Sequence, residues 1–470
     1  IHVSEAARSA QLADITGDKK PDLIIQGMYQ YPLRVFDLST LPAKDVTNFL
    51  PLIKSCPNNN CLASSDQEDT LAPRDAAIAD FNGDLRADIF LPRSLVDTQE
   101  SIIFLDHSKK LIEAVLKPLN EEHGFSFVSS GSITFNFLGN KKGDQSPDVS
   151  EIFIGSNGFN PTQIPFVLNS NDQNIRGIKQ HIPGNDSGVY IGYYKTSKIW
   201  KVLYSNSRKG EKNNLPIIAE TSQIFASLKI INFTPKRILN NALKPRVFSY
   251  NTEAGKYVDT STLSGFGKPI LGQYVVSGDF DNDMDIDLYV SCSYINFDVE
   301  NKFYRNQGNG KFIDDTSASG LIEKRKGPHK FNYSLGQKLA VADYDNDGFL
   351  DIFSSPTTFG AFEKIYLGAS QKLFRNLGNR NHWIEINLRG TVSNRDGIGA
   401  RVIATTNGIS QLREQGGGIH QFAQNQQRIH FGLANNTLVD KLVIQWPSGI
   451  EQTLTNIPSD QILEIVEPSA

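Results

Sequence analysis

The apolar residues of this chain come in short runs that are typical of β-strands. Residues 274–276 and 288–290 lie on either side of one acidic segment, and residues 339–341 and 352–353 lie on either side of another. These runs are rich in β-branched and aromatic residues and are too short for helices. Further strand-like runs between residues 188 and 204 have no acidic segment beside them. The pattern predicts an all-β protein in which the acidic segments connect strands.

The acidic segment is repeated four times. Each copy spans nine residues with Asp at its first, fifth and ninth positions, and the copies begin at Asp14, Asp80, Asp279 and Asp343. The first residues are 66 positions apart in the first pair (14 to 80) and 64 positions apart in the last pair (279 to 343). A fixed period of this length is the signature of a repeat architecture. We therefore expect one structural unit that recurs along the chain.

A fifth, degraded copy continues the period. It contains Asp144 and Asp148, and Asp144 lies 135 positions before Asp279, which is close to two periods. Its spacing departs from that of the other copies, so we expect no metal there. The array of units is nevertheless predicted to run without interruption.

A second shared element follows the last two copies. Residues 301–312 and 371–379 both read as a strand followed by an Asn/Gly turn, which is typical of a β-hairpin. Two hairpins per period make a four-stranded blade, and a closed ring of blades covers the faces and edges that one blade leaves open. We expect a β-propeller of about six or seven blades within residues 1–378. A solenoid or two stacked sandwiches is the alternative, because residues 150–265 are assigned to blades by spacing alone.

The repeated segment collects oxygen ligands at regular positions. Side-chain oxygens stand at positions 1, 3, 5 and 9, and position 7 offers its backbone carbonyl. Calcium takes about six to eight such hard ligands, whereas magnesium fits less well and no Cys/His cluster has zinc spacing. The predicted ligand residues are Asp14, Thr16, Asp18, Lys20, Asp22, Asp80, Asn82, Asp84, Arg86, Asp88, Asp279, Asp281, Asp283, Asp285, Asp287, Asp343, Asp345, Asp347, Phe349 and Asp351. About four calcium ions are therefore expected.

The four copies differ in charge. Copies three and four carry carboxylates at all four side-chain positions, and these would repel one another strongly without a cation. Copies one and two have Thr16 and Asn82 at the third position and are expected to bind more weakly. An EF-hand would need Glu at the twelfth position, where this chain has Val290 and Ser354. The remaining alternative is a solvated acidic turn without metal.

These four loops resemble the FG-GAP/VCBS repeats found in integrin α-chain propellers and in many secreted bacterial proteins. The resemblance rests on the residue-by-residue match of the copies that begin at Asp14, Asp80, Asp279 and Asp343. It implies an integrin α-like propeller with calcium held in hairpin loops.

A different β pattern begins near Asn381. Residues 382–390 and 442–446 alternate between apolar and polar side chains with a period of two. A small C-terminal β-domain is therefore predicted over residues 379–470. Residues 394–399 form either a binding loop around a carboxylate or a tight turn with two glycines at positive φ.

Several blocks of this domain occur in the order that characterises one family. Residues 394–401, 415–418, 430–433 and 446–449 closely resemble the ASPIC/UnbV domain. Together with the acidic loops, they describe the architecture of the cartilage acidic protein-like family. That resemblance implies an extracellular or periplasmic location.

Composition narrows the function classes. The net charge is −4 and no run of Lys and Arg stands out, which argues against a nucleic-acid partner. No apolar stretch approaches the roughly 20 residues of a transmembrane helix. Cys56 and Cys61 are spaced for a local disulfide in an oxidising compartment, whereas Cys292 is expected to be a small buried apolar residue. We expect a secreted, periplasmic or otherwise extracytoplasmic protein.

No catalytic residue can be assigned from motifs. Residues 184–188 superficially resemble the segment around a serine nucleophile, but no partner His or Asp can be placed from spacing. The main hypothesis is a calcium-stiffened binding or structural module with a protein or glycan partner. The alternatives are an enzyme with its active site in the propeller funnel, and a stable subunit of a larger assembly.

Overall fold

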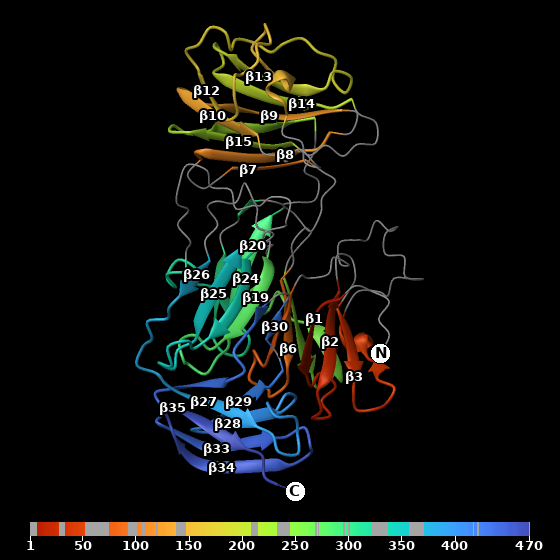
Figure 1. Cartoon of the computed structure of the whole chain (residues 1–470), viewed down its shortest axis with the longest axis vertical. Coiled ribbons are helices and arrows are strands. Elements are labelled where there is room, and N and C mark those ends of the chain that lie inside the picture. Colours follow the sequence, from red (N-terminus) through yellow and green to blue (C-terminus); the bar gives the residue numbers. More distant parts are fainter. Residues whose placement is uncertain are drawn as a thin grey trace. The chain divides into compact units, whose positions relative to one another are not determined.

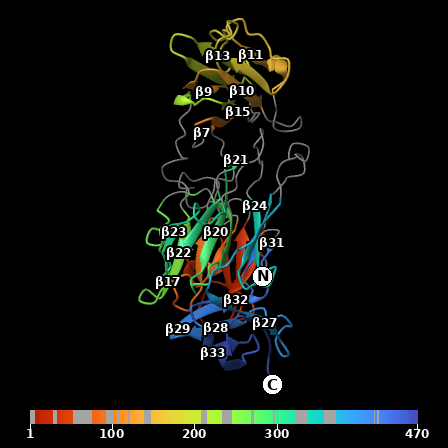
Figure 2. The same ribbon diagram turned by 90° about the vertical axis from the view of Figure 1, so that its left-hand side faces the viewer.

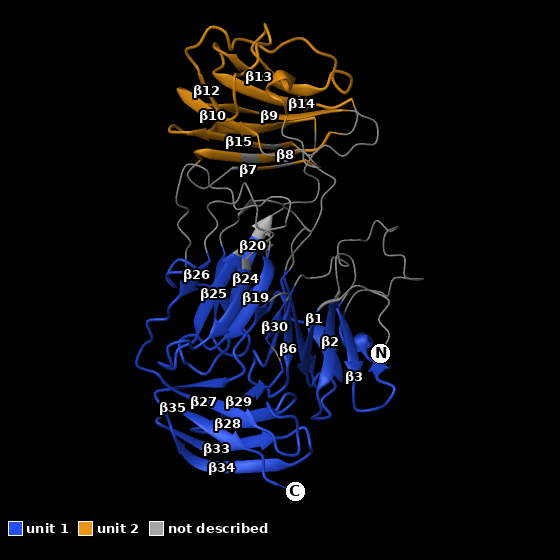
Figure 3. Ribbon diagram, in the orientation of Figure 1, with its two compact units in different colours: residues 1–96, 241–470 blue, residues 97–240 orange. Residues whose placement is uncertain are grey.

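The computed structural model describes two compact units, which are coloured separately in Figure 3. Unit 1 combines residues 1–96 with residues 241–470, and unit 2 comprises residues 97–240. The described residues are 7–27, 33–51, 75–92, 101–105, 109–118, 121–137, 147–207, 215–232, 245–267, 270, 272–294, 297–298, 301–321, 337–356, 371–416, 418–420 and 423–469. The possible disulfide partners Cys56 and Cys61, and Asp144 of the degraded copy, lie outside these ranges.

Four antiparallel sheets of unit 1 follow the predicted repeat (Figure 1). The first sheet contains β1 (Ala7–Ala13), β2 (Asp22–Gly27), β3 (Arg34–Asp37) and β4 (Lys44–Asp45). The second has the order β18 (Lys256–Asp259), β17 (Arg246–Asn251), β6 (Asp88–Leu91) and β5 (Ala77–Ala79). The third contains β19 (Gly272–Gly278), β20 (Asp287–Tyr294), β22 (Lys302–Asn306) and β23 (Phe312–Asp314), with β21 (Phe297–Asp298) beside β20. The fourth contains β24 (Gln337–Ala342), β25 (Asp351–Pro356) and β26 (Lys372–Phe374).

The acidic segments connect the first two strands of each sheet, as the sequence predicts. Each segment starts directly after one strand and its ninth residue opens the next, from β1 to β2, β5 to β6, β19 to β20 and β24 to β25. Both flanking strands are apolar because the sheets pack face to face. The flanking strands therefore hold the four loops at one end of their sheets.

Three apolar cores join the four sheets in order. Ile24, Ile89 and Phe248 belong to the core between the first and second sheets. Phe90, Leu288 and other buried residues fill the space between the second and third. A further core, which includes Tyr289 and Leu339, joins the third and fourth. Cys292 is buried in the second of these cores, which confirms its predicted place as a small apolar residue.

The all-β class is confirmed, whereas the predicted ring of six or seven blades is not. Among the described residues the helical elements are the 3-10 turns η1 (Thr47–Phe49) and η4 (Val149–Glu151). Within the described ranges the four sheets do not close into a ring. The C-terminal strands β30 (Ile419–His420) and β31 (Ala423–Gln424) contact β1 and β24, the first strands of the first and fourth sheets. No described helix is long and apolar enough to cross a membrane.

Unit 2 differs from the uninterrupted blade array that the period predicted. Its two five-stranded sheets have the orders β12-β10-β15-β8-β7 and β11-β13-β14-β9-β16, with β11 and β13 parallel. Their strands are β7 (Ile102–Leu105), β8 (Leu111–Leu116), β9 (Glu122–Val128), β10 (Ser132–Phe137), β11 (Ile152–Ile154), β12 (Phe166–Asn169), β13 (Gly188–Tyr194), β14 (Ile199–Ser205), β15 (Leu215–Thr221) and β16 (Ala226–Ile231). Phe127, Phe135 and Trp200 lie in one core shared by both sheets. The unit is a β-sandwich inserted in the chain between β6 and β17.

Asp148 of the degraded copy has a local role in unit 2. Its carboxylate accepts a hydrogen bond from the Ser150 backbone N–H, and the Glu151 carboxylate accepts one from the Asp148 backbone N–H. This reciprocal arrangement is a capping box at the start of η4. The expectation that this copy holds no metal stays a prediction.

The remaining strands of unit 1 form the C-terminal β-domain. One sheet has the order β32-β27-β35 and another has the order β29-β28-β33-β34. Their strands are β27 (His382–Arg389), β28 (Arg401–Thr406), β29 (Ile409–Glu414), β32 (Ile429–Ala434), β33 (Leu438–Gln445), β34 (Glu451–Pro458) and β35 (Gln461–Val466). Ile386, Phe431 and Leu442 share its apolar core. Figure 2 shows these strands at one end of the four repeated sheets.

One carboxylate anchors the loop that follows β27. Glu467 accepts hydrogen bonds from the backbone N–H groups of Thr391, Val392 and Ser393 and from the Ser448 hydroxyl. Burial alone would raise the pKa of Glu467, but the hydrogen bonds from Ser448, Ser393 and Thr391 lower it to about 2. Further along the same loop, Gly397 and Gly399 have φ of 63° and 95°, as the tight-turn alternative predicted.

The substitution Glu467→Gln should make the free energy of unfolding depend less on pH in the acid range. Since the folded pKa lies below the ordinary value of 4.5, the carboxylate stabilises the fold fully above that pH and loses its contribution as the pH falls toward about 2. The variant should be less stable than the wild type at pH 7 and approach it at low pH, as measured by denaturant unfolding at several pH values. The control is Glu464→Gln on β35, three residues earlier, where the exposed pair with Arg389 is worth little. A pH-independent difference for Glu467→Gln would contradict this account.

Candidate metal centres

The four acidic loops have the same unusual backbone conformation. Position 4 has positive φ in every copy, with Gly17, Gly83, Asn282 and Asn346 at this place. Position 6 also has positive φ, with Lys19, Leu85, Met284 and Gly348. Positive φ is uncommon for residues other than glycine, so the loop must be held by specific interactions.

The aspartates at positions 1 and 9 supply those interactions. In the second loop, Asp80 accepts hydrogen bonds from the N–H groups of Gly83, Asp84 and Leu85 at 2.9–3.1 Å. Asp88 accepts one from Phe81 N at 2.9 Å. In each of the other three loops the first Asp accepts two of these three N–H groups, always including that of position 6, and the ninth Asp accepts the N–H of position 2. These carboxylates therefore shape the turn in addition to being candidate ligands.

The position 5 carboxylate is oriented in the same way in all four copies. It accepts a hydrogen bond from the N–H of position 7 at 2.9–3.1 Å, in the pairs Lys20 to Asp18, Arg86 to Asp84, Asp285 to Asp283 and Phe349 to Asp347. This hydrogen bond fixes the orientation of the position 5 carboxylate. The local geometry is thus compatible with the ligand set inferred from the sequence.

The position 3 carboxylates of the last two loops have one oxygen in use and one oxygen without a partner. One Asp281 oxygen pairs with Arg305, and Asp345 Oδ2 lies 2.6 Å from Arg375 Nε. Asp281 Oδ1 and Asp345 Oδ1 are buried and make no hydrogen bond. A buried, unpaired carboxylate oxygen is costly unless a cation or donor meets it. Both oxygens fit the requirement for a metal ligand.

Two groups of three carboxylates are close enough to share an ion. Asp279, Asp281 and Asp283 each offer an oxygen within 4.8 Å of the others, as do Asp343, Asp345 and Asp351. Two ligands on opposite sides of a calcium ion would be separated by about twice the usual 2.3–2.6 Å bond. The donor set, all oxygen and mostly charged, suits calcium.

Loops one and two form weaker candidate sites. Thr16 Oγ1 in the first loop and Asp88 Oδ1 in the second are buried without a hydrogen-bond partner. In the second loop the Asn82 side chain is turned to Asp84, with its amide nitrogen 3.2 Å from Asp84 Oδ2. Neither loop places three carboxylates as close together as loops three and four do within the described ranges. The expectation of weaker binding there stays a prediction.

Burial disfavours charge on these carboxylates when no ion is bound. Burial, together with the neighbouring Asp283, raises the pKa of Asp279 to about 7, although Arg413 opposes the shift. In the second loop burial raises the pKa of Asp80 to about 6 and that of Asp88 to about 8. A bound divalent cation would reverse these shifts.

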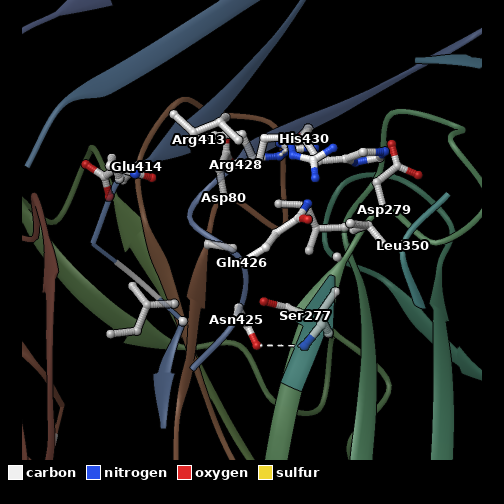
Figure 4. Close-up of a pocket in the computed structure, with 18 of the residues that line it drawn as sticks. Asp80, Ser277, Asp279, Leu350, Arg413, Glu414, Asn425, Gln426, Arg428 and His430 are labelled. Atoms are coloured by element: carbon white, nitrogen blue, oxygen red, sulfur yellow. Dashed lines mark hydrogen bonds between the residues drawn. The ribbon is translucent and has the colours of Figure 1, made fainter. Parts of the chain in front are cut away.

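The C-terminal domain covers the same end of the sheets, which the spacing of the acidic loops did not predict. The Ala434 N–H donates to Asn282 O at 2.8 Å, and His430 Nε2 lies 3.0 Å from Gly348 O. The Asp14 N–H donates to Glu414 Oε1 at 3.1 Å. A cavity of about 150 Å³ remains beside the loops, and Figure 4 shows it.

Several arginines near the loops were not predicted from the sequence. Arg305 and Arg375 follow the same hairpin position in two repeats, which is a signal that the aligned segments 301–312 and 371–379 contain. Arg413 and Arg428 belong to a separate domain, and both line the cavity in Figure 4. These two arginines come close to the loops only because the C-terminal domain docks on them, so local sequence spacing does not predict their position.

Comparisons with known proteins agree with both resemblances. Residues 279–354, which contain loops three and four, match the FG-GAP-like repeat family, and residues 390–470 match the ASPIC and UnbV family. Cartilage acidic protein 1 of Mus musculus and of Homo sapiens are each 23% identical to this chain over 210 residues. The match covers 43% of this chain but 30% of the mouse protein and 29% of the human protein. The chain thus contains FG-GAP-like repeats and an ASPIC/UnbV domain and spans under a third of those relatives.

The substitution Gly432→Ala tests the contact between the C-terminal domain and loop three. A Cβ at this position would lie 2.1 Å from Asp279 Oδ2 and 2.4 Å from the Cα of Asn282. Since one of these neighbours is backbone, the domain must shift, and we expect a loss of about 1–3 kcal/mol in the free energy of unfolding. Denaturant titration measures the effect. Gly267→Ala, where a Cβ meets nothing within 4 Å, is the matched control and should be neutral. Equal effects of the two substitutions would show that the contact is loose.

Proposed function

We propose that this chain is a calcium-binding, extracytoplasmic β-propeller-type module that binds a protein or glycan partner. The single observation that carries the calcium assignment is the shared state of Asp281 and Asp345. In each, one oxygen faces an arginine and the other is buried without a partner, within reach of two further carboxylates. Of the common cations, calcium fits this set of oxygens best.

The four repeated sheets are best understood as consecutive blades. Each has the acidic loop between its first two strands, and each packs face to face on the next. We assign residues 1–378, with the inserted sandwich at residues 97–240, to the propeller-type part and residues 379–470 to the ASPIC/UnbV domain. The assignment is supported by the family matches at residues 279–354 and 390–470.

Extracytoplasmic location and a binding role are supported by the same matches. FG-GAP-like repeats are typical of extracellular binding modules, and the curated relatives are named cartilage acidic protein 1. An active site at the centre of the sheets is a weaker alternative. The strands β30 and β31 lie against β1 and β24. The observation that bears on this alternative is the pair of His420 on β30 and the buried Asp75, where His420 Nδ1 lies 2.9 Å from the carboxylate.

The direct test is a metal count on the purified protein, combined with thermal unfolding in calcium and in excess EGTA. We expect about four calcium ions and a lower unfolding midpoint after chelation, because each ion stabilises the folded state by about 2.7 kcal/mol at a hundredfold excess over its Kd. Absence of calcium together with an unchanged midpoint in EGTA would refute the proposal.

Single substitutions locate the ions. Asp281→Asn and Asp345→Asn should each lower the count by about one ion, because each removes the charge from a ligand oxygen that has no other partner. Calcium titration by calorimetry measures the loss. Asp440→Asn is the control, because Asp440 is exposed and its carboxylate accepts a hydrogen bond from the Asn407 N–H. A full complement of ions in both loop variants would remove loops three and four from the assignment.

A further inference from the structure

Arginines of the C-terminal domain stand beside the first-position aspartates of the acidic loops. Arg401 Nη1 on β28 lies 3.6 Å from Asp14 Oδ2 in loop one. Arg428 Nη1, just before β32, lies 4.0 Å from Asp343 Oδ2 in loop four and donates to Asn346 Oδ1 of the same loop at 2.8 Å. The aspartate side chains are only 2% and 0% exposed. Each arginine also pairs with a carboxylate of its own domain, Arg401 with Glu414 and Arg428 with Glu385. Two loops thus have a cation from the C-terminal domain at the same position, and each loop shares it with one carboxylate of that domain.

Arg413 is the arginine of the C-terminal domain that lies near the two middle loops. Its half-buried guanidinium donates to His430 O, Leu412 O and Gln411 Oε1 at 3.0–3.1 Å, so the C-terminal domain holds it in place. Its charge acts on Asp279 of loop three and Asp80 of loop two. All three residues line the cavity of Figure 4.

These arginines do not block the oxygens expected to bind calcium at position 3. Asp281 and Asp345 pair through their other oxygens with Arg305 and Arg375 of the repeats, and their Oδ1 atoms have no partner. The C-terminal arginines instead approach the position 1 carboxylates, whose oxygens also accept loop N–H groups. They are therefore placed to compensate charge at the edge of each candidate site.

We propose that Arg401, Arg413 and Arg428 are positioning residues that act as built-in counter-cations for the calcium loops. The inference rests on the proposed calcium binding. With calcium bound, the ion compensates the loop carboxylates and the arginines contribute little. Without calcium, these arginines add to the loop N–H groups and to Arg305 and Arg375 in opposing the mutual repulsion of the loop carboxylates, and they keep the C-terminal domain docked on loops that would otherwise separate. The domain and the ion therefore stabilise the same loops by partly redundant means.

The test compares Arg413→Met with wild type by thermal unfolding in calcium and in EGTA. Removing the cation leaves Asp80 and Asp279 buried without it, so we expect the midpoint to fall by about 10 °C in EGTA and by less than half as much in calcium. Arg413→Lys keeps the charge, so its unfolding midpoint in EGTA should recover most of the loss seen in Arg413→Met. The control Arg389→Met removes an exposed arginine of the same domain. Its unfolding midpoint should fall only slightly, and by the same amount in calcium and in EGTA.

A second variant covers the case in which Arg413→Met does not fold. Arg428→Gln removes a cation whose side chain is 20% exposed, and it should show the same calcium-dependent loss. An equal loss with and without calcium in the folded variants would overturn the inference and assign the arginines a purely structural role. The metal count of the wild type distinguishes a failure of this inference from a failure of the proposed calcium binding. If the wild type holds calcium but the variants lose stability equally, only this inference fails, whereas a wild type without calcium refutes both.

Discussion

The burial of charge at the strand ends is the constraint on which unit 1 depends. The first and ninth aspartates of the loops are almost fully enclosed, with exposed fractions of 3% for Asp14 and 1% for Asp343. A buried carboxylate is expensive unless donors or cations surround it. The loop backbone therefore adopts positive φ at positions 4 and 6, which turns successive N–H groups toward the first aspartate. The unusual conformation is a consequence of the charge.

The same ends of the sheets are tied to one another by a repeated contact. The carbonyl of position 2 accepts a hydrogen bond from the following sheet, with Arg86 at 3.5 Å from Ile15 O in the first case. Asn306 Nδ2 donates to Phe81 O at 2.9 Å, and Asn376 Nδ2 donates to Phe280 O at 2.7 Å. Each of these loops is thereby linked to its neighbour as well as to its own strands. Stabilising one loop should stiffen the next.

The C-terminal domain completes this arrangement. It supplies Glu414 and Gln426, which accept the N–H groups of Asp14 and Asp343, at the very residues that open loops one and four. Its strand β32 approaches loop three so closely that only glycine fits at position 432. The proposed binding function therefore belongs to the repeats and this domain together. A partner surface on either part would be sensitive to the state of the loops.

The sequence by itself determined the features that depend on local spacing. The four loops, their flanking strands, the strand-rich C-terminal domain and the candidate ligand positions all follow from short-range patterns, because side-chain period and turn chemistry are local properties. Only the tertiary structure decided that residues 97–240 form a separate sandwich and that β17 joins β6 across this insertion. It also decided which arginines face the loops. Strand pairing and domain docking join residues hundreds of positions apart, such as Arg401 and Asp14, and the buried surface and charge that favour those pairings exist only once the chain has folded.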